Sequence, residues 1–270
     1  MTTISTTIAL TTTDRSTVRT RHDDRRAVPA ALRSEWIKLS TLRTNKVIAF
    51  LAIAVSAFTA WAVGMSETQL TAAEIAVYPT VLVAMLAAVA SILLFTGEAQ
   101  HGTLALALTA RPARWVLVVA KTATAITIGF VLGAVGMVAG FGGGVLAGLD
   151  LGDGSNLVTR ALWALLYTSL SAVIGLGIGM MVRHSAGAVS GLLMWSFVVE
   201  NLLAPALPGR LVHYLPFSAG YRLLDVGSDF DTPVIIATQL SRPQYALIFG
   251  GYALAALLVG TVLLYRRDNN

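Results

Sequence analysis

Side chains that could break covalent bonds or hold a metal ion are scarce in this chain. It has no cysteine, which excludes a disulfide framework, a thiolate metal site and a cysteine nucleophile. Its four histidines are far apart in the sequence, so we expect no metal site. A GxxxxGKS/T phosphate-binding loop is absent. We therefore predict that the chain has no catalytic residue and no cofactor of its own, and that any chemical energy comes from a partner.

Polar side chains gather instead in one island, GEAQHGTLALALTARPARW, at residues 97–115. Thr103 can cap a helical turn, and Arg111 precedes a proline that pushes it away from helical dihedrals. The predicted element is therefore a helix of about 8 residues, or 12 Å, although the alternation of Leu and Ala also fits a strand. Glu98, Arg111 and Arg114 would flank it as charged contacts with a soluble partner. The positive charge of cytoplasmic loops explains the arginines equally well.

Apolar composition decides the class of protein. Of the 270 residues, 56% are hydrophobic and only 12% are charged, which is too apolar for a soluble core of that size. A spanning helix needs roughly 20 apolar residues, and we predict six spans at residues 47–65, 75–95, 116–149, 161–182, 185–204 and 245–265. The fifth has the shortest uncharged run. The chain is thus expected to be an all-α integral membrane protein, with its permease domain at 29–268.

The distribution of Lys and Arg predicts the orientation of these spans. With six spans, 15 of the basic residues lie on the side of the two termini and 4 lie on the other. Short cytoplasmic loops are enriched in Lys and Arg, so both termini and the island should be cytoplasmic, in a multi-pass plasma-membrane protein. Residues 1–28 lack the apolar core of a signal peptide and should form a disordered tail, or contribute electrostatic contacts at the membrane surface. We expect no nucleic-acid partner.

The segment before the first span, ALRSEWIKLSTLRTNK, has apolar residues at helical spacing. Trp36 belongs to this apolar face, while Arg33, Glu35 and Lys38 occupy the other faces. This pattern predicts an interfacial helix that leads into the first span. An ordinary basic flank is the alternative.

Glycines recur at small-xxx-small spacing in three predicted spans. The pairs are Gly129/Gly133, Gly136/Gly140, Gly140/Gly144 and Gly144/Gly148 in the third, Gly175/Gly179 in the fourth and Gly187/Gly191 in the fifth. Such spacing lets helix backbones approach closely. We therefore expect these faces to pack against other helices.

Glu200 is the acidic residue nearest to the interior of a predicted span. Ion-driven carriers usually keep an ionisable residue inside the bilayer, but Glu200 lies at the outer end beside Asn201, where a carboxylate can reach water. We expect an interfacial or structural role, with ion coupling as the alternative. The long apolar segment that follows should pack back onto the spans as a re-entrant region or outer gate, broken at Pro205, Pro208 and Pro216. The simpler alternative is that this segment forms an ordered outer cap without a gating role.

Several stretches together resemble the permease subunits of ABC exporters of the type-2 family, particularly those of actinobacteria. They are LRSEWIKLSTLRTNK before the first span, GEAQHGTLALALTARPARWVLVVAK after the second, GLGIGMMVRHSAGAVSGLLMWSFVVENLL across the fourth and fifth, LPFSAG, and the closing RRD. The order and placement of these stretches agree with the count of six spans. The resemblance covers roughly residues 31–268 and excludes the Thr-rich tail.

The resemblance implies partners and a contact site. In that family a separate ATPase subunit, expected in two copies, binds ATP and Mg, and two permease subunits, identical or homologous, pair around a translocation path. A short coupling helix between the second and third spans rests in a groove of the ATPase. The matching residues here are Glu98, His101, Gly102, Thr103, Leu106, Arg111, Pro112 and Arg114. The implied function is the transmembrane subunit of an ATP-driven exporter.

Two other classes of function remain open at this point. A regulatory or assembly subunit that transports nothing would also need glycine-rich packing faces. A secondary transporter would have to use Glu200 or no intramembrane charge at all. The apolar spans fit drugs, lipids, peptides and antibiotics alike, so the substrate is not predicted.

Overall fold

A computed structural model describes residues 29, 31–37, 39, 43–67, 69–100, 114–152, 154, 156–224 and 233–267, and within these residues every regular element is a helix. Six helical segments are long and apolar enough to cross a membrane: Arg43–Ser66, Ala72–Gln100, Trp115–Leu146, Leu157–Val182, Ser185–Ala206 and Arg242–Arg266. This confirms the predicted all-α, six-span membrane protein. The spans are helical because lipid offers no water to hydrogen-bond with backbone N–H and C=O groups. Each span must therefore form these hydrogen bonds within itself, as a helix does.

The first four spans are simple helices or nearly so. They are α2 (Arg43–Ser66), the short α3 (Ala72–Ile75) followed by α4 (Thr80–Gln100), α6 (Arg114–Leu146) and α7 (Leu157–Val182). The fifth span consists of α8 (Ser185–Leu193), a π-helical segment η1 (Met194–Val199) and α9 (Glu200–Ala206). Short helices α10 (Gly209–Val212), α11 (Pro216–Tyr221), η2 (Arg222–Leu224, 3₁₀) and α12 (Pro233–Ala237) precede the last span, α13 (Arg242–Arg267).

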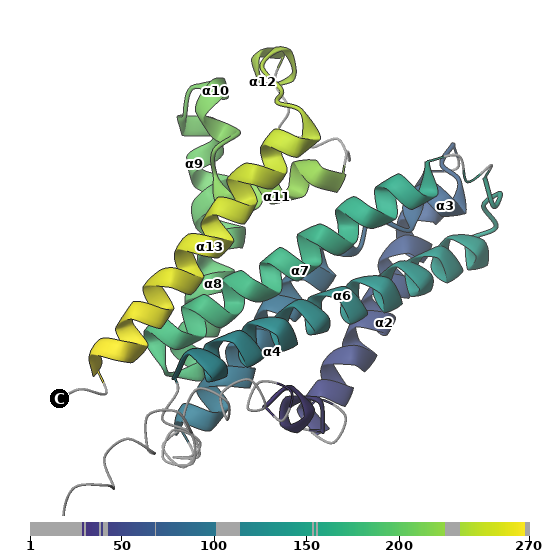
Figure 1. Cartoon of the computed structure of the whole chain (residues 1–270). Coiled ribbons are helices and arrows are strands. Elements are labelled where there is room, and N and C mark those ends of the chain that lie inside the picture. Colours follow the sequence, from purple (N-terminus) through teal and green to yellow (C-terminus); the bar gives the residue numbers. More distant parts are fainter. Residues whose placement is uncertain are drawn as a thin grey trace, which may run out of the picture.

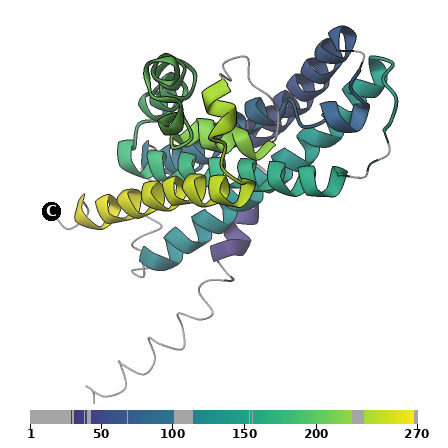
Figure 2. The same ribbon diagram turned by 90° about the horizontal axis from the view of Figure 1, so that it is seen from above.

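The helices α4 and α7 form the centre of the bundle. In the most apolar stretch of the α3–α4 span and of α7, 61% of the residues are buried, against 17% in the fifth span and 22% in the last. Both α6 and α13 pack along α7, and α2 packs along α6 (Figures 1 and 2). The fifth and last spans therefore leave many of their apolar side chains exposed on the surface of the described chain.

Glycines allow the central helices to touch through their backbones, as their spacing predicts. A Cβ atom added at Gly175 of α7 would collide with the backbone of Ala88 in α4. One added at Gly129 of α6 would lie 2.5 Å from the carbonyl oxygen of Thr168 in α7. The fifth span differs, because a Cβ atom at Gly191 would meet nothing within 4 Å. The glycine face of α8 is thus not packed at Gly191 against the described part of this chain.

The elements divide between two ends of the bundle. We name helical residues 31–37 the N-helix; it lies at the end where α4 finishes and α6 begins (Figure 1). We call this end the N-helix end. At the opposite end lie α3 and the group α9–α12 (Figure 1). Both ends hold deeply buried charged side chains, Lys121 and Glu35 at the N-helix end and Glu200 at the other.

Candidate functional site

Lys121 is the centre of a buried ionic cluster at the N-helix end. Its side chain lies two turns into α6 and is fully buried. The ammonium nitrogen Nζ is 2.9 Å from Oε2 of Glu98 and 3.5 Å from Oε2 of Glu35. It also donates a hydrogen bond of 3.3 Å to the carbonyl oxygen of Leu94. The cluster Glu35–Lys121–Glu98 therefore joins three elements, the N-helix, α4 and α6.

The cluster follows from helical spacing and burial. Leu94 and Glu98 lie four residues apart on α4, hence on one face, and both reach Lys121. Removing a charge from water is costly unless the charge is paired and hydrogen-bonded. Two carboxylates beside one ammonium satisfy Lys121 and leave the cluster with a formal charge of −1 when all three groups are ionised.

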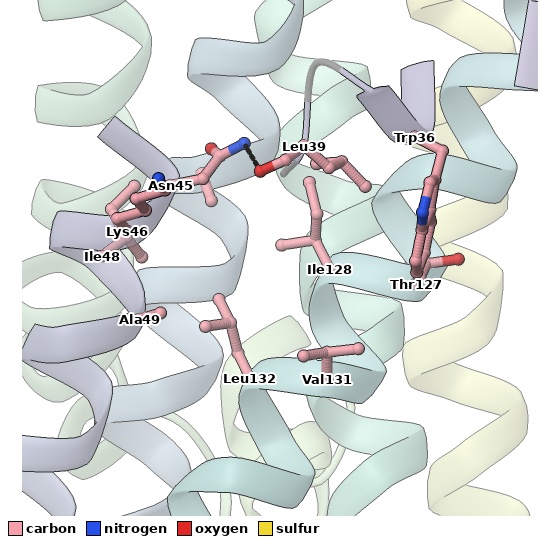
Figure 3. Close-up of a pocket in the computed structure, with 11 residues that line it drawn as sticks. Trp36, Leu39, Asn45, Lys46, Ile48, Ala49, Thr127, Ile128, Val131 and Leu132 are labelled. Carbon is pink, nitrogen blue, oxygen red and sulfur yellow. Dashed lines mark hydrogen bonds between the residues drawn. The ribbon is translucent and has the colours of Figure 1, made fainter. Parts of the chain in front are cut away.

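One residue of the N-helix, Glu35, departs from the predicted amphipathic pattern. Glu35 was expected on a polar face, but it is only 3% exposed and turns toward Lys121. Trp36, predicted on the apolar face, is 61% exposed and lies beside Thr127 of α6 (Figure 3). The reason is that Ala31, one turn before Glu35, packs with Val116 and Ala120 of α6, so the small and acidic face is the buried one. Arg33 is exposed as predicted, and Lys38 lies outside the described residues.

The polar island is described only at its two edges. Glu98 lies two residues before the end of α4, and Arg114 begins α6. The other predicted contact residues lie outside the described residues: His101, Gly102, Thr103, Leu106, Arg111 and Pro112. The sequence suggested that Glu98 has its ionic partner on another subunit, whereas the structure places Lys121 of the same chain beside it. The island therefore starts and ends at elements that this ion pair clamps together.

Glu200 is the buried charge of the opposite end. Its carboxylate accepts hydrogen bonds from Nε1 of Trp195 at 3.1 Å and from the backbone N–H of Phe217 at 2.9 Å. Ser218 donates two more, from its backbone N–H at 2.8 Å and from its hydroxyl at 2.9 Å. The residue is 3% exposed, which corrects the expectation that the carboxylate reaches water. These donors let a carboxylate remain buried without a cation.

The fifth span ends two residues after its predicted end at residue 204, and two of the three predicted proline breakpoints hold. Pro205 lies inside α9, which ends at Ala206, so Pro205 is not the expected breakpoint. The break comes at Leu207, whose backbone is extended, and Pro208 then starts α10 as its N-cap. Pro216 occupies the first turn of α11, where a missing N–H costs nothing. The short helix α11 packs against α13, so the segment does return to the bundle.

The π-helical segment η1 brings Trp195 to Glu200 and was not predicted. A π-helical turn adds residues to the helix and changes which side chains face inward. Trp195 and Glu200 are five residues apart, the spacing of π-helical hydrogen bonds, and the backbone N–H of Glu200 bonds to the carbonyl oxygen of Trp195. The apolar sequence MWSFVV does not distinguish a π-helical segment from an α-helical one. Asn201 is on the exposed side and donates to the carbonyl oxygen of Phe197.

A cavity of about 530 Å³ opens beside Glu200. It lies among η1, α9, α10 and α11, and its lining mixes apolar walls with polar groups. The polar members include Ser196, Glu200, Asn201, Ser218 and Arg222. Within the described residues, no three His, Asp or Glu side chains are placed to share a metal ion. The cavity is thus a mixed polar pocket next to a fixed carboxylate.

Comparison with models of protein families identifies a family for this chain. The family model described as ABC-2 family transporter protein matches residues 38–269 of the chain. The match includes all six spans, the polar island and the segment between the fifth and sixth spans. No curated protein matches the chain.

Proposed function

We propose that this chain, which belongs to the ABC-2 family of transporter proteins, is the transmembrane subunit of an ATP-driven exporter. It is a multi-pass membrane protein of a family of membrane components, and the family implies association with an ABC ATPase subunit in general. In our proposal a separate ATPase, present in two copies, binds ATP and Mg and grips the segment 98–114. The observation that carries the proposal is the cluster Glu35–Lys121–Glu98 at the base of that segment.

The cluster offers a physical route from the island to the spans. Glu98 stands just before the island and Lys121 just after it, and their charged atoms are 2.9 Å apart. A displacement of the island by a soluble partner would move α4 and α6 together, because separating the pair would leave a buried charge without its partner. Glu35 extends this connection to the N-helix. The partner's motion would therefore reach three elements through one side chain.

The orientation of the chain is part of the proposal. The N-helix and the edges of the island lie at the same end of the bundle (Figure 1), and most of the described Lys and Arg residues belong to this end. We therefore place it in the cytoplasm. Because the chain lacks cysteine, single cysteines can test this: one at Ser66 or Gly152 should react with an impermeant thiol reagent in intact cells, and one at Ala113 should not. Reaction at Ala113 alone would reverse the orientation.

A second permease subunit, identical or homologous, would complete the translocation path. The support is the uncovered apolar surface of the fifth and last spans, in which only 17% and 22% of the residues of the most apolar stretch are buried. Lipid covers part of such a surface in any membrane protein. A partner helix would also explain the unpacked glycine of α8, since small residues admit a close neighbour.

The test is a charge placed in the proposed apolar contact with the ATPase. Leu106→Asp should abolish co-purification of the ATPase subunit and substrate-stimulated ATP hydrolysis, because an unpaired carboxylate would be buried at the contact. Leu151→Asp is the matched control, since Leu151 is exposed in the loop after α6 at the opposite end. Permease abundance is measured in the same membranes. If the Leu106→Asp variant still co-purifies with the ATPase and still supports substrate-stimulated ATP hydrolysis, the island is not the coupling element.

The same experiment separates the two other classes of function. A secondary transporter would move substrate in vesicles that contain this chain and no ATPase. A regulatory or assembly subunit would co-purify with partners without supporting ATP-dependent transport. Only the exporter requires both a bound ATPase and ATP-dependent movement of substrate.

A further inference from the structure

An apolar groove opens on the side of the bundle between the N-helix, α2 and α6 (Figure 3). Its volume is about 300 Å³, at the lower limit of typical ligand sites. Buried side chains form its floor: Ile48, Ala90, Ile128 and Leu132. Its lining is almost wholly apolar, and exposed Trp36 and Val131 stand at its edge. The groove therefore faces the hydrocarbon of the membrane and not the interior of the protein.

A second hollow of about 300 Å³ lies next to the first. The two share Trp36, Leu39 and Thr127, so these residues form the wall between them. The Asn45 side chain donates a hydrogen bond of 3.2 Å to the carbonyl oxygen of Leu39, which ties the first turn of α2 to Leu39 (Figure 3). Two adjacent apolar hollows under one helix suit a ligand with two hydrocarbon chains.

The rim of the two hollows is positively charged. Lys46 lines the first hollow and Arg33 lines the second. Arg43 lies one helical turn before Lys46 and is exposed as well. The nearby acidic residue, Glu35, is buried and turned inward to Lys121, so its carboxylate lies away from this rim. Basic pockets between membrane helices on the cytoplasmic side attract anionic lipid headgroups.

We propose that the groove is a binding site for one anionic diacyl phospholipid. The acyl chains occupy the two hollows on either side of Trp36, and the phosphate lies against Lys46 and Arg33. A second copy of this chain is disfavoured as the occupant, since a symmetric contact would bring two cationic rims together. The tail at residues 1–28 is disfavoured for the same reason, because its five arginines outnumber its three aspartates.

The test is lipid retention by the full chain. The protein is reconstituted in vesicles of phosphatidylglycerol and phosphatidylcholine in equal amounts, extracted in mild detergent, and its bound lipids are counted by native mass spectrometry. One phosphatidylglycerol should remain bound in preference to phosphatidylcholine. Lys46→Gln and Arg33→Gln should each lower this preference about fivefold, the effect expected for one basic residue near the surface. Arg266→Gln, at the exposed end of α13, is the matched control and should leave it unchanged.

A filling substitution provides an independent check. Ala49 lines the first hollow, so Ala49→Phe should remove the retained lipid while leaving the rim charges in place. Equal retention of the two lipids, or none, would overturn the proposal. A preference for phosphatidylglycerol that survives Lys46→Gln and Arg33→Gln would also overturn it, by placing the lipid elsewhere. The rim variants decide the question even if Ala49→Phe does not fold.

Discussion

Lys121 and Glu200 are both buried in a membrane protein, but they are stabilised in opposite ways. Lys121 faces the charged side chains of Glu35 and Glu98, which come from two other elements. Glu200 faces uncharged donors, three of which belong to Phe217 and Ser218 at the start of α11. The first arrangement connects separate helices through opposite charges. The second fixes one short helix to the end of a span.

This difference indicates that Lys121 links separate elements, whereas Glu200 has a structural role within one end of the bundle. Each contact of Lys121 crosses from one element to another, so any motion of α4, α6 or the N-helix changes its environment. The donors to Glu200 are held by backbone geometry and by a neighbouring indole, so they move as one unit with α9 and α11. The N-helix end is therefore the better candidate for transmitting motion, and the opposite end for closing the bundle.

The largest effect is expected from Lys121→Met. The substitution removes the ammonium group that lies between the buried Glu35 and the partly buried Glu98, which should lower the free energy of unfolding by about 3–5 kcal/mol. Thermal unfolding in detergent, followed by tryptophan fluorescence, measures the loss. The triple variant with Glu35→Gln and Glu98→Gln should recover most of it, because none of the three charges of the cluster remains. An unchanged midpoint in the single variant would mean that the cluster is not a buried ionic site.

An intermediate effect is expected from Glu200→Gln. The amide keeps the shape of the side chain but loses its charge and turns an NH₂ group toward backbone donors, which should cost about 1.5–3 kcal/mol. The emission of Trp195 should shift, because its indole N–H loses a charged acceptor. ATP-driven transport should remain independent of pH. A wild-type pH dependence that disappears in this variant would instead assign ion coupling to Glu200 and remove the contrast with Lys121.

The smallest effect concerns the two carboxylates of the cluster. Glu98→Gln and Glu35→Gln each leave Lys121 with one carboxylate, so the loss should be about 1 kcal/mol or less for each. A double-mutant cycle with Lys121→Met should give the larger coupling for Glu98, which is 2.9 Å from Nζ, than for Glu35, at 3.5 Å. Equal or inverted couplings would show that the N-helix is tied to α6 as tightly as α4 is.

The sequence alone determined the fold class, the number of spans and the position of the polar island. The reason is that these features depend on long runs of apolar residues, and lipid forces every such run into a helix. The predicted helix contacts at Gly129 and Gly175 also follow, because a missing side chain permits close approach in any arrangement of the spans. Boundaries agree less closely, since α6 runs from Arg114 to Leu146 where the sequence predicted 116–149.

Only the tertiary structure decided which charged side chains meet. Glu35, Glu98 and Lys121 look like ordinary flanks in the sequence, and their pairing depends on how the N-helix, α4 and α6 are rotated and packed. The donors to Glu200 depend likewise on the π-helical segment η1 and on α11, more than ten residues further along the chain. Burial turns such residues from solvated charges into fixed contacts, and burial is a property of neighbours that a single apolar pattern does not specify.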